Sequence, residues 1–440
     1  MSQHRRDFLK RSVGIAGALS LTGMLEPLFA AELESQSKRM AAVSPESAAS
    51  DEDFWGWVRE SYTVSPEIIN LNNGGVSPSP VPVQNAMKKY LDLCNEGPSY
   101  YMWKILDQGR ESLRMKLAEL AGCSPEELAI NRNSTEALNT VIFGLNMKAG
   151  DEVILSKYDY PSMENAWKQR EQRDGVKLVW VDLTLPYDND KDILAAYEKV
   201  ITPRTKIIHV THVINWTGQI MPAKKLADLA HSHGCEIILD CAHSFAHLDY
   251  TFPELNCDYA GVSLHKWLCA PIGSGLLYMK KDKIKNIWPL LSSAKPDSDD
   301  IRKFESLGTR SFASEMSIGY AVDFQNIIGN KRKQARLQYL KNYWAEKAAK
   351  IPKVKLNTSL NPQYSCALCH FSIEGWNGAD IDAKLFDKYK IHVTSNDWEK
   401  INGVRVTPHV YTNIQELDRL VKGITEIAAM EPPPITAKKG

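Results

Sequence analysis

Strand-like and helix-like runs alternate through the centre of this chain, and this alternation restricts the possible fold more than any other feature. Short apolar runs typical of buried strands lie at 152–155, 176–181, 206–210, 236–240, 259–263 and 275–279. Segments with helical spacing lie between or before them, at 106–121, 138–145 and 223–233. Strands joined through helices pair in parallel and are covered on both faces. The sequence therefore predicts an α/β fold with a mostly parallel central sheet.

Polar residues stand where several of these predicted strands end. Asp240 and Ser263 each close a strand, and Ser134 with Thr135 opens the helix that follows another. Parallel α/β sheets bind their ligands at the carboxyl ends of the strands. These residues are therefore the first candidates for a functional site.

The pattern changes after a long helix-like segment at 331–350. Strand-like runs near 368–373 and 404–407 flank a helical segment at 381–389, which predicts a smaller C-terminal α+β domain. The predicted organisation is a signal peptide at 1–30, a leader and arm at 31–74, a large domain at 75–329, a small domain at 330–432 and a disordered tail at 433–440.

The first thirty residues have the pattern of an export signal. Arg5 and Arg6 are followed by Phe8, Leu9 and Lys10, and then by an apolar stretch at 13–25. That stretch is shorter than the ~20 residues needed to span a bilayer. The pattern resembles a bacterial twin-arginine signal, so we expect the twin-arginine machinery as a partner, the periplasm as the destination and no membrane attachment after cleavage. The alternative is a chance arginine pair before an amphipathic helix.

The charge balance argues against a nucleic-acid or membrane-surface partner. Lys plus Arg and Asp plus Glu both number 53, so the formal net charge is 0. A chain without excess positive charge has no general electrostatic attraction for phosphate backbones.

The eight cysteines are dispersed, and most lie in apolar segments, where a thiol usually acts as a small buried hydrophobe. One group, Cys366-Ala367-Leu368-Cys369-His370, matches the attachment pattern of c-type haem. It lies in a run at 364–373 that looks like a buried strand, which favours a structural role and leaves haem as the weaker alternative. We predict no metal site.

Lys266 and Asp240 form the pair that points most directly to a chemistry. Lys266 follows a predicted buried strand, where an ammonium group is costly unless it is paired or used chemically. Pyridoxal 5'-phosphate (PLP) chemistry needs a lysine that forms a Schiff base with the cofactor aldehyde, and an acid that keeps the pyridine nitrogen protonated. Ala242 is small enough for a flat ring to lie on it. A surface lysine at a strand end is the alternative.

With its neighbours, this segment resembles the class V aminotransferase family of fold-type I PLP enzymes, and within it the isopenicillin N epimerase-like branch. The resemblance is carried by Ser263-Leu264-His265-Lys266-Trp267-Leu268 and the glycines that follow, and it extends from about Ile69 to Ile427. It implies a homodimer with active sites at the subunit interface and a small amino compound as substrate.

The resemblance also implies roles for individual residues. Lys266 would bind the cofactor aldehyde and Asp240 the pyridine nitrogen, and Arg405 would clamp the substrate carboxylate, for which a planar guanidinium is suited. Asn73 lies where the family's N-terminal arm approaches the substrate. Further cofactor contacts fall on Ser134, Thr135, Tyr158, Asn215, His243, Ser263, His265 and Thr309, the last toward the neighbouring subunit.

Two departures from the family pattern bear on the reaction. The family stacks a histidine on the cofactor, and we match that position to Tyr158, a poorer proton carrier near neutral pH. Cysteine desulfurases carry a nucleophilic cysteine ahead of the carboxylate-binding arginine, but residues 389–403 contain none. The sequence thus predicts a PLP-dependent epimerase or aminotransferase acting at Cα outside the cytoplasm. The alternatives are a PLP-dependent lyase or desulfurase and a non-catalytic binding protein with this fold.

Overall fold

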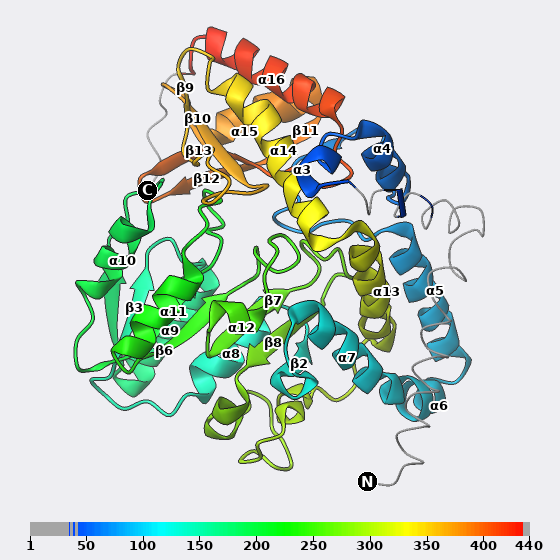
Figure 1. The fold of residues 1–440 in the computed structure, drawn as a ribbon, viewed down its shortest axis with the longest axis vertical. Coiled ribbons are helices and arrows are strands. Elements are labelled where there is room, and N and C mark those ends of the chain that lie inside the picture. The colour runs from blue at the N-terminus through cyan, green and yellow to red at the C-terminus, as the bar shows by residue number, and fades with distance from the viewer. Residues whose placement is uncertain (1–34, 36–37, 40–42, 434–440) are drawn as a thin grey trace.

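The computed structural model describes residues 35, 38–39 and 43–433, and Figure 1 shows two stacked regions, each built around its own sheet. The predicted signal peptide and most of the predicted tail lie outside these residues. Among the described residues, no helix is both long and apolar enough to cross a membrane. The predicted domain boundaries at residues 74, 329 and 432 stay predictions.

A seven-stranded sheet forms the centre of the larger region, in the order β2-β8-β7-β6-β5-β3-β4. Only β8 runs antiparallel to its neighbours, so the other strands end at the same edge of the sheet. The strands are β2 (Leu128–Asn131), β3 (Glu152–Ser156), β4 (Lys177–Val181), β5 (Thr205–Thr211), β6 (Glu236–Asp240), β7 (Tyr259–Ser263) and β8 (Gly275–Met279). The predicted mostly parallel sheet is therefore confirmed.

Alternate side chains of these strands enter two separate hydrophobic cores, as the pleat of a strand requires. Ile208 and Ile237 pack on the face covered by α7 (Arg110–Ala121), α11 (Ala223–Ser232) and α13 (Phe312–Ile328). Their neighbours Ile207 and Ile238 pack on the face covered by α8 (Ser134–Gly144) and α9 (Pro161–Asp174). A sheet that is buried on both faces explains why the strands read as continuous apolar runs.

The smaller region is an antiparallel sheet in the order β12-β13-β10-β9, packed against helices. Its elements are α14 (Asn330–Ala348), β9 (Val354–Leu356), β10 (Cys369–Ile373), α15 (Gly378–Tyr389), β11 (Ile391–His392), β12 (Thr394–Trp398), β13 (Ile401–Val406) and α16 (Ile414–Ala429). The predicted small α+β region is confirmed by this sheet and its helices.

The segment before the large sheet connects the two regions. β1 (Ile69–Asn70) pairs with β11 of the smaller region, and residues 71–78 then run toward the carboxyl edge of the large sheet. The remaining helices are α3 (Pro45–Ala48), α4 (Glu52–Glu60), α5 (Val81–Glu96), α6 (Pro98–Tyr100), α10 (Asp190–Glu198) and α12 (Phe252–Leu255). Shorter helical turns lie at Tyr101–Leu106, Asp107–Gly109, Pro125–Glu127, Lys281–Asn286 and Ile301–Glu305.

The helix expected at 106–121 is shorter than the periodicity suggested. A π-helical turn at Tyr101–Leu106 and a 3₁₀ turn at Asp107–Gly109 precede α7, which begins only at Arg110. Gly109 stands at this junction, and glycine is a weak helix former.

The haem-like motif belongs to the core of the smaller region. Cys369 and His370 are the first residues of β10, and Cys366, Cys369 and His370 are all fully buried. Haem attachment would require both sulfurs to reach a cavity of macrocycle size, so the structure supports the strand interpretation. The eight cysteines form no disulfide.

Candidate active site

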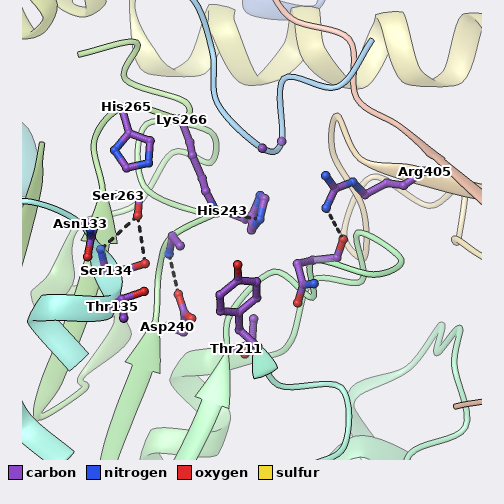
Figure 2. Close-up of a pocket in the computed structure, with 15 residues that line it drawn as sticks. Asn133, Ser134, Thr135, Thr211, Asp240, His243, Ser263, His265, Lys266 and Arg405 are labelled. Atoms are coloured by element: carbon purple, nitrogen blue, oxygen red, sulfur yellow. Dashed lines mark hydrogen bonds between the residues drawn. The ribbon is translucent and has the colours of Figure 1, made fainter. Parts of the chain in front are cut away.

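A cavity of about 280 Å³ opens at the carboxyl edge of the large sheet, between the two regions. Figure 2 shows Ser134, Thr135 and Ser263 at one end of it, Arg405 at the other, and Asp240, His243 and Lys266 between them. Nine of the sequence-predicted residues line this cavity: Ser134, Thr135, Asn215, Asp240, His243, Ser263, His265, Lys266 and Arg405. Strand ends that are far apart in sequence thus meet in one site, as expected for a parallel sheet.

The N-terminus of α8 forms one end of the cavity. The helix is capped by Asn133, whose side chain accepts a hydrogen bond from the Glu136 amide at 2.9 Å. The sequence suggested that Ser134 and Thr135 cap this helix. They are instead its first two residues. Their hydroxyls stay near the amides of the first turn, where the helix dipole favours an anion.

Ser263 is fixed against this helix end. Its hydroxyl accepts a hydrogen bond from the Ser134 amide at 3.0 Å and donates to the Ser134 hydroxyl at 2.9 Å. Close packing of the strands against the helix makes this possible, because a Cβ on Gly261 would lie 2.5 Å from Leu138. His265 lies beside them, with Nδ1 3.1 Å from the Ser274 carbonyl oxygen.

Lys266 projects into the centre of the cavity and is half-buried there. Its Nζ lies 3.1 Å from Nε2 of His243. Burial lowers the pKa of Lys266 to about 8, against the opposing effect of the Asp240 charge. Burial, together with the charges of Lys266 and Arg405, holds the pKa of His243 well below its usual range. His243 is therefore neutral, and at pH 7 about a tenth of Lys266 is the free amine, far more than for a lysine with an ordinary pKa.

Asp240 ends β6 on the floor of the cavity. Its Oδ1 accepts a hydrogen bond from the Ala242 amide at 2.9 Å. Burial raises the pKa of this carboxyl, while the Ala242 amide and the Lys266 charge lower it. Asp240 is thus a buried acid that lines the cavity, with one oxygen fixed by the Ala242 amide.

Arg405 stands at the opposite end of the cavity from Ser134. It lies on β13, with Nη1 donating to the Asn215 carbonyl at 2.8 Å and Nη2 to Asn72 Oδ1 at 3.1 Å. Burial lowers its pKa to about 10, so it remains a cation at physiological pH. The Asn215 loop reaches Arg405 because Gly218, at φ +81°, lies against the Leu368 carbonyl, where a Cβ would be only 2.4 Å away.

Three polar atoms of the lining residues are buried and have no hydrogen-bond partner within the described residues: Asn215 Oδ1, His243 Nδ1 and Arg405 Nε. Buried polar groups in native proteins are nearly always paired. Their convergence on one cavity that also holds two cationic side chains indicates a polar, anionic ligand with several hydrogen-bonding groups.

The structure corrects the predicted position of the stacking ring. Tyr158 does not line the cavity; it packs in the hydrophobic core. Asp159 accepts hydrogen bonds from the Ser156 and Thr211 amides, which folds the turn after β3. Tyr160, two residues later and just before α9, lines the cavity instead, with its ring centroid 5.9 Å from Lys266 Nζ. The proline at the first position of α9 was the sequence signal that could have located it.

Asn73 is also outside the cavity. Its amide nitrogen donates to the Asn70 and Thr407 carbonyls, and its oxygen accepts from the Tyr411 hydroxyl. All of its hydrogen-bonding capacity is therefore used to fold the arm. The arm approaches the site through Gly74 and Gly75, which line the cavity, and through Asn72, which holds Arg405.

Thr309 lines a different cavity, of about 270 Å³, together with Gly273 and Ser274. Its predicted contact is with the cofactor of a neighbouring subunit, so that role stays a prediction. Among the residues that the structure describes, no cluster of His, Cys, Asp or Glu is placed to hold a metal ion.

Sequence comparison matches the model of one family, described as Aminotransferase class-V, to residues 69–420. Isopenicillin N epimerase of Amycolatopsis lactamdurans is 28% identical over 393 residues, which cover 85% of this chain and 98% of the relative. A probable cysteine desulfurase of Synechocystis sp. is 25% identical over 402 residues, covering 83% and 94%.

Comparison of structures gives the same fold. C-DES with glycine covalently linked to its PLP cofactor superposes with a TM-score of 0.76 at 21% identity, covering 84% of this chain and 99% of that one. The arrangement of a mostly parallel large sheet with a smaller C-terminal sheet is therefore that of the fold-type I PLP enzymes.

Proposed function

Because this chain belongs to the class-V aminotransferase family and is a PLP-dependent enzyme, we propose that it acts at the α-carbon of an amino acid or an amino-acid-containing compound, as an epimerase or an aminotransferase. The observation that carries the proposal is the position of the half-buried Lys266 amine, 3.1 Å from the neutral His243 in a cavity that the buried Asp240 also lines.

The cavity fits pyridoxal 5'-phosphate on its own features. The α8 N-terminus, with Ser134, Thr135, Ser263 and His265, would hold a phosphate. The unpaired Asn215 Oδ1 and His243 Nδ1 would face the polar edge of the ring, over the small side chain of Ala242. When bound, PLP supplies an aldehyde that captures an amine and a ring that accepts electrons from Cα.

The residues of this chain supply the binding and the proton movements. Arg405 would hold the substrate carboxylate, because its Nε has no other partner within the described residues and its Nη groups are already fixed. Lys266 Nζ would then take the α proton from one face of Cα. A lysine with a pKa of about 8 is suited to this work, because a general base is most effective when its pKa lies near the working pH.

The two candidate reactions differ in the fate of the substrate after proton removal. Return of the proton to the opposite face of Cα gives the epimer. In transamination the amino group would pass to the cofactor and from it to an acceptor keto acid, which leaves the substrate as a keto acid. The test is incubation of the holoenzyme with single enantiomers of amino acids, with and without pyruvate or 2-oxoglutarate as amino acceptor, followed by chiral chromatography and assay of the keto acid formed from each substrate. Appearance of the opposite enantiomer supports the epimerase, a keto acid supports the aminotransferase, and neither product from any amino compound contradicts the proposal.

We expect cofactor uptake by the apoprotein to depend on pH through the Lys266 amine. Only the neutral amine attacks an aldehyde, so the rate of covalent uptake should rise about tenfold per pH unit below 8 and level off near pH 8. Stopped-flow absorbance after mixing with PLP measures this rate. A rise that continues beyond pH 10, as for an exposed lysine, would show that burial does not control this amine.

We expect no cysteine desulfurase activity, although desulfurases are among the relatives. Desulfuration needs a thiolate that reaches the substrate sulfur. None of the described residues that line the cavity is a cysteine, and burial raises the pKa of the Cys366 thiol to about 12 and that of Cys369 to about 11. Purified protein given cysteine and a reductant should release alanine and sulfide only at background rates. Rapid alanine release that is lost in Cys369→Ser would reverse this conclusion.

The proposed assembly is a homodimer with active sites at the subunit interface. It is supported by apolar side chains exposed around the cavity of Thr309: Ile272 lines that cavity, and Trp103 contacts Arg310. Exposed apolar clusters of this kind mark protein interfaces. Sedimentation equilibrium of the mature protein tests the assembly, and a monomer at micromolar concentration would contradict it.

The proposed location, the periplasm, is supported by the sequence of residues 4–30 alone. We expect the double substitution Arg5→Lys, Arg6→Lys to leave the precursor in the cytoplasm, because twin-arginine transport reads this pair. Cell fractionation measures the distribution, with a substitution at Lys38 as the matched control. Normal amounts of mature periplasmic protein from the double variant would refute the twin-arginine interpretation.

A further inference from the structure

A third and larger cavity, of about 660 Å³, lies along the arm that borders the active site. The arm forms one wall of this groove through Val64, Ile68, Val76 and Pro78, and the smaller region forms the other through Phe386 and His392. Ile68, Val76 and Phe386 are 37%, 44% and 38% exposed, so three large apolar side chains face open space in one groove.

The groove has no charged lining. Among the described residues that border it, none is Lys, Arg, Asp or Glu, and the polar members are asparagines, hydroxyl residues and His392. A charged occupant would lose hydration there without gaining a counter-charge. The groove therefore suits an uncharged, mainly apolar group.

The groove and the active-site cavity meet at the arm. Gly75 lines both cavities, and Asn72 lines the groove while its Oδ1 accepts the hydrogen bond from Arg405. Gly75 adds no side chain to the boundary between them. Arg405 lies against the arm, since a Cβ on Gly74 would be 3.3 Å from its Nη2, so a substrate held by Arg405 would have its remaining atoms near the part of the arm that borders both cavities.

The sizes of the two cavities point to one substrate that uses both. The active-site cavity, at about 280 Å³, is at the lower end of the volumes that hold a single drug-sized ligand. Because it must accommodate both the cofactor and the reacting part of the substrate, little room remains for a long side chain or an acyl extension.

We propose that this groove binds an uncharged apolar extension of the substrate, so that the substrate class is an amino-acid compound with a hydrocarbon group several carbons long. The inference rests on the proposed function, because it takes Arg405 as the carboxylate-binding residue. The groove then sets substrate preference: each methylene buried there raises kcat/KM roughly three- to fourfold.

The test is a chain-length series of alanine, 2-aminobutyrate, norvaline, norleucine and 2-aminooctanoate, given to the holoenzyme as both enantiomers. Two readouts are measured: product formation, and the dissociation constant by titration calorimetry, which requires no turnover. We expect affinity to rise with chain length from norvaline onward. Phe386→Ser and Val76→Ser should remove most of the gain in affinity that 2-aminooctanoate has over alanine. The affinity for alanine should be nearly unchanged.

Two further variants make the result specific. Leu91→Ser is the matched control, because Leu91 is 51% exposed on α5, away from the groove, and it should leave the chain-length series unchanged. Gly75→Val places a side chain at the junction; a Cβ there meets nothing closer than 3.6 Å, so the variant should fold. Gly75→Val should weaken the binding of 2-aminooctanoate by a factor at least ten times larger than it weakens the binding of alanine.

The possible outcomes distinguish the proposed function from the proposed role of the groove. Absence of any product from the whole series contradicts the proposed function, while the calorimetric series still decides the role of the groove. Product formation with equal affinity for all chain lengths overturns the groove assignment alone. If Phe386→Ser changes the molecular mass in solution and not the chain-length series, a second copy of the chain covers the groove and the inference is wrong.

Discussion

Lys266→Ala should abolish covalent cofactor binding and reduce turnover by at least about a thousandfold. Lys266 is the only lysine among the described residues that line the active-site cavity, so no other amine there can bind the aldehyde or move the α proton. The protein should still fold, because the Nζ hydrogen bond to His243 is the polar contact that the substitution removes. Borohydride reduction followed by mass spectrometry measures the covalent cofactor, and the product assays measure turnover.

Lys333→Met is a matched control for this experiment. Lys333 is a buried lysine whose pKa is likewise lowered to about 8 by burial, but it lies outside the cavity and donates to Gln325 Oε1 at 2.7 Å and to the Trp267 carbonyl. This control should lose stability, since two acceptors become unpaired, and should keep the reducible cofactor. Retention of both cofactor linkage and activity in Lys266→Ala would show that the active site has been assigned to the wrong residues.

Asp240→Asn should retain PLP but lose about a hundredfold or more in turnover, since a neutral amide cannot hold the pyridine nitrogen protonated. The substitution preserves shape and the hydrogen bond from the Ala242 amide, so the fold should survive. The Asp240 charge also raises the pKa of Lys266, and its removal should move the pH midpoint of cofactor uptake below 8. Steady-state kinetics and the pH profile of uptake measure the two effects.

Asp258→Asn is the control for this substitution. Asp258 contacts the other end of β6, the strand that Asp240 ends. Asp258 is a buried aspartate that accepts a hydrogen bond from the Ile237 amide of β6 at 2.8 Å, far from the carboxyl edge that carries the active site. It should lower thermal stability without changing the pH profile. If Asp240→Asn behaved in the same way, with turnover preserved, the acid would have only a structural role.

Much of the large region could be predicted because its sheet is buried on both faces. The apolar runs at 236–240 and 259–263 coincide with β6 and β7, and Asp240 and Ser263, which end them, therefore mark the carboxyl edge correctly. A buried parallel strand leaves a long apolar run in the sequence, so its end is easy to locate. This is why Lys266, Asp240 and Ser263 were found together.

The errors fall in turns and in the arm, where hydrogen bonds and not periodicity determine which way a side chain points. Asn133, as good a cap as serine, caps α8 one residue earlier, so Ser134 falls in the first turn of the helix. Tyr158 and Tyr160 exchange roles because Asp159 folds the turn between them. The side chain of Asn73 is fully hydrogen-bonded to Asn70, Thr407 and Tyr411. The sequence does not show these contacts, because two of the partners are distant in the chain and the third lies in the same arm.

The central claim is that Lys266 moves a proton at Cα of an amino compound, and exchange of that proton with solvent tests it most directly. Holoenzyme incubated in deuterium oxide with 2-aminooctanoate and with alanine is followed by proton NMR of the Cα position. We expect the wild-type protein and Lys333→Met to replace the α proton with deuterium, and Lys266→Ala to do so at the rate of free PLP in solution. Exchange by Lys266→Ala at the wild-type rate, or retention of the α proton by the wild-type protein with every amino compound, would contradict the account.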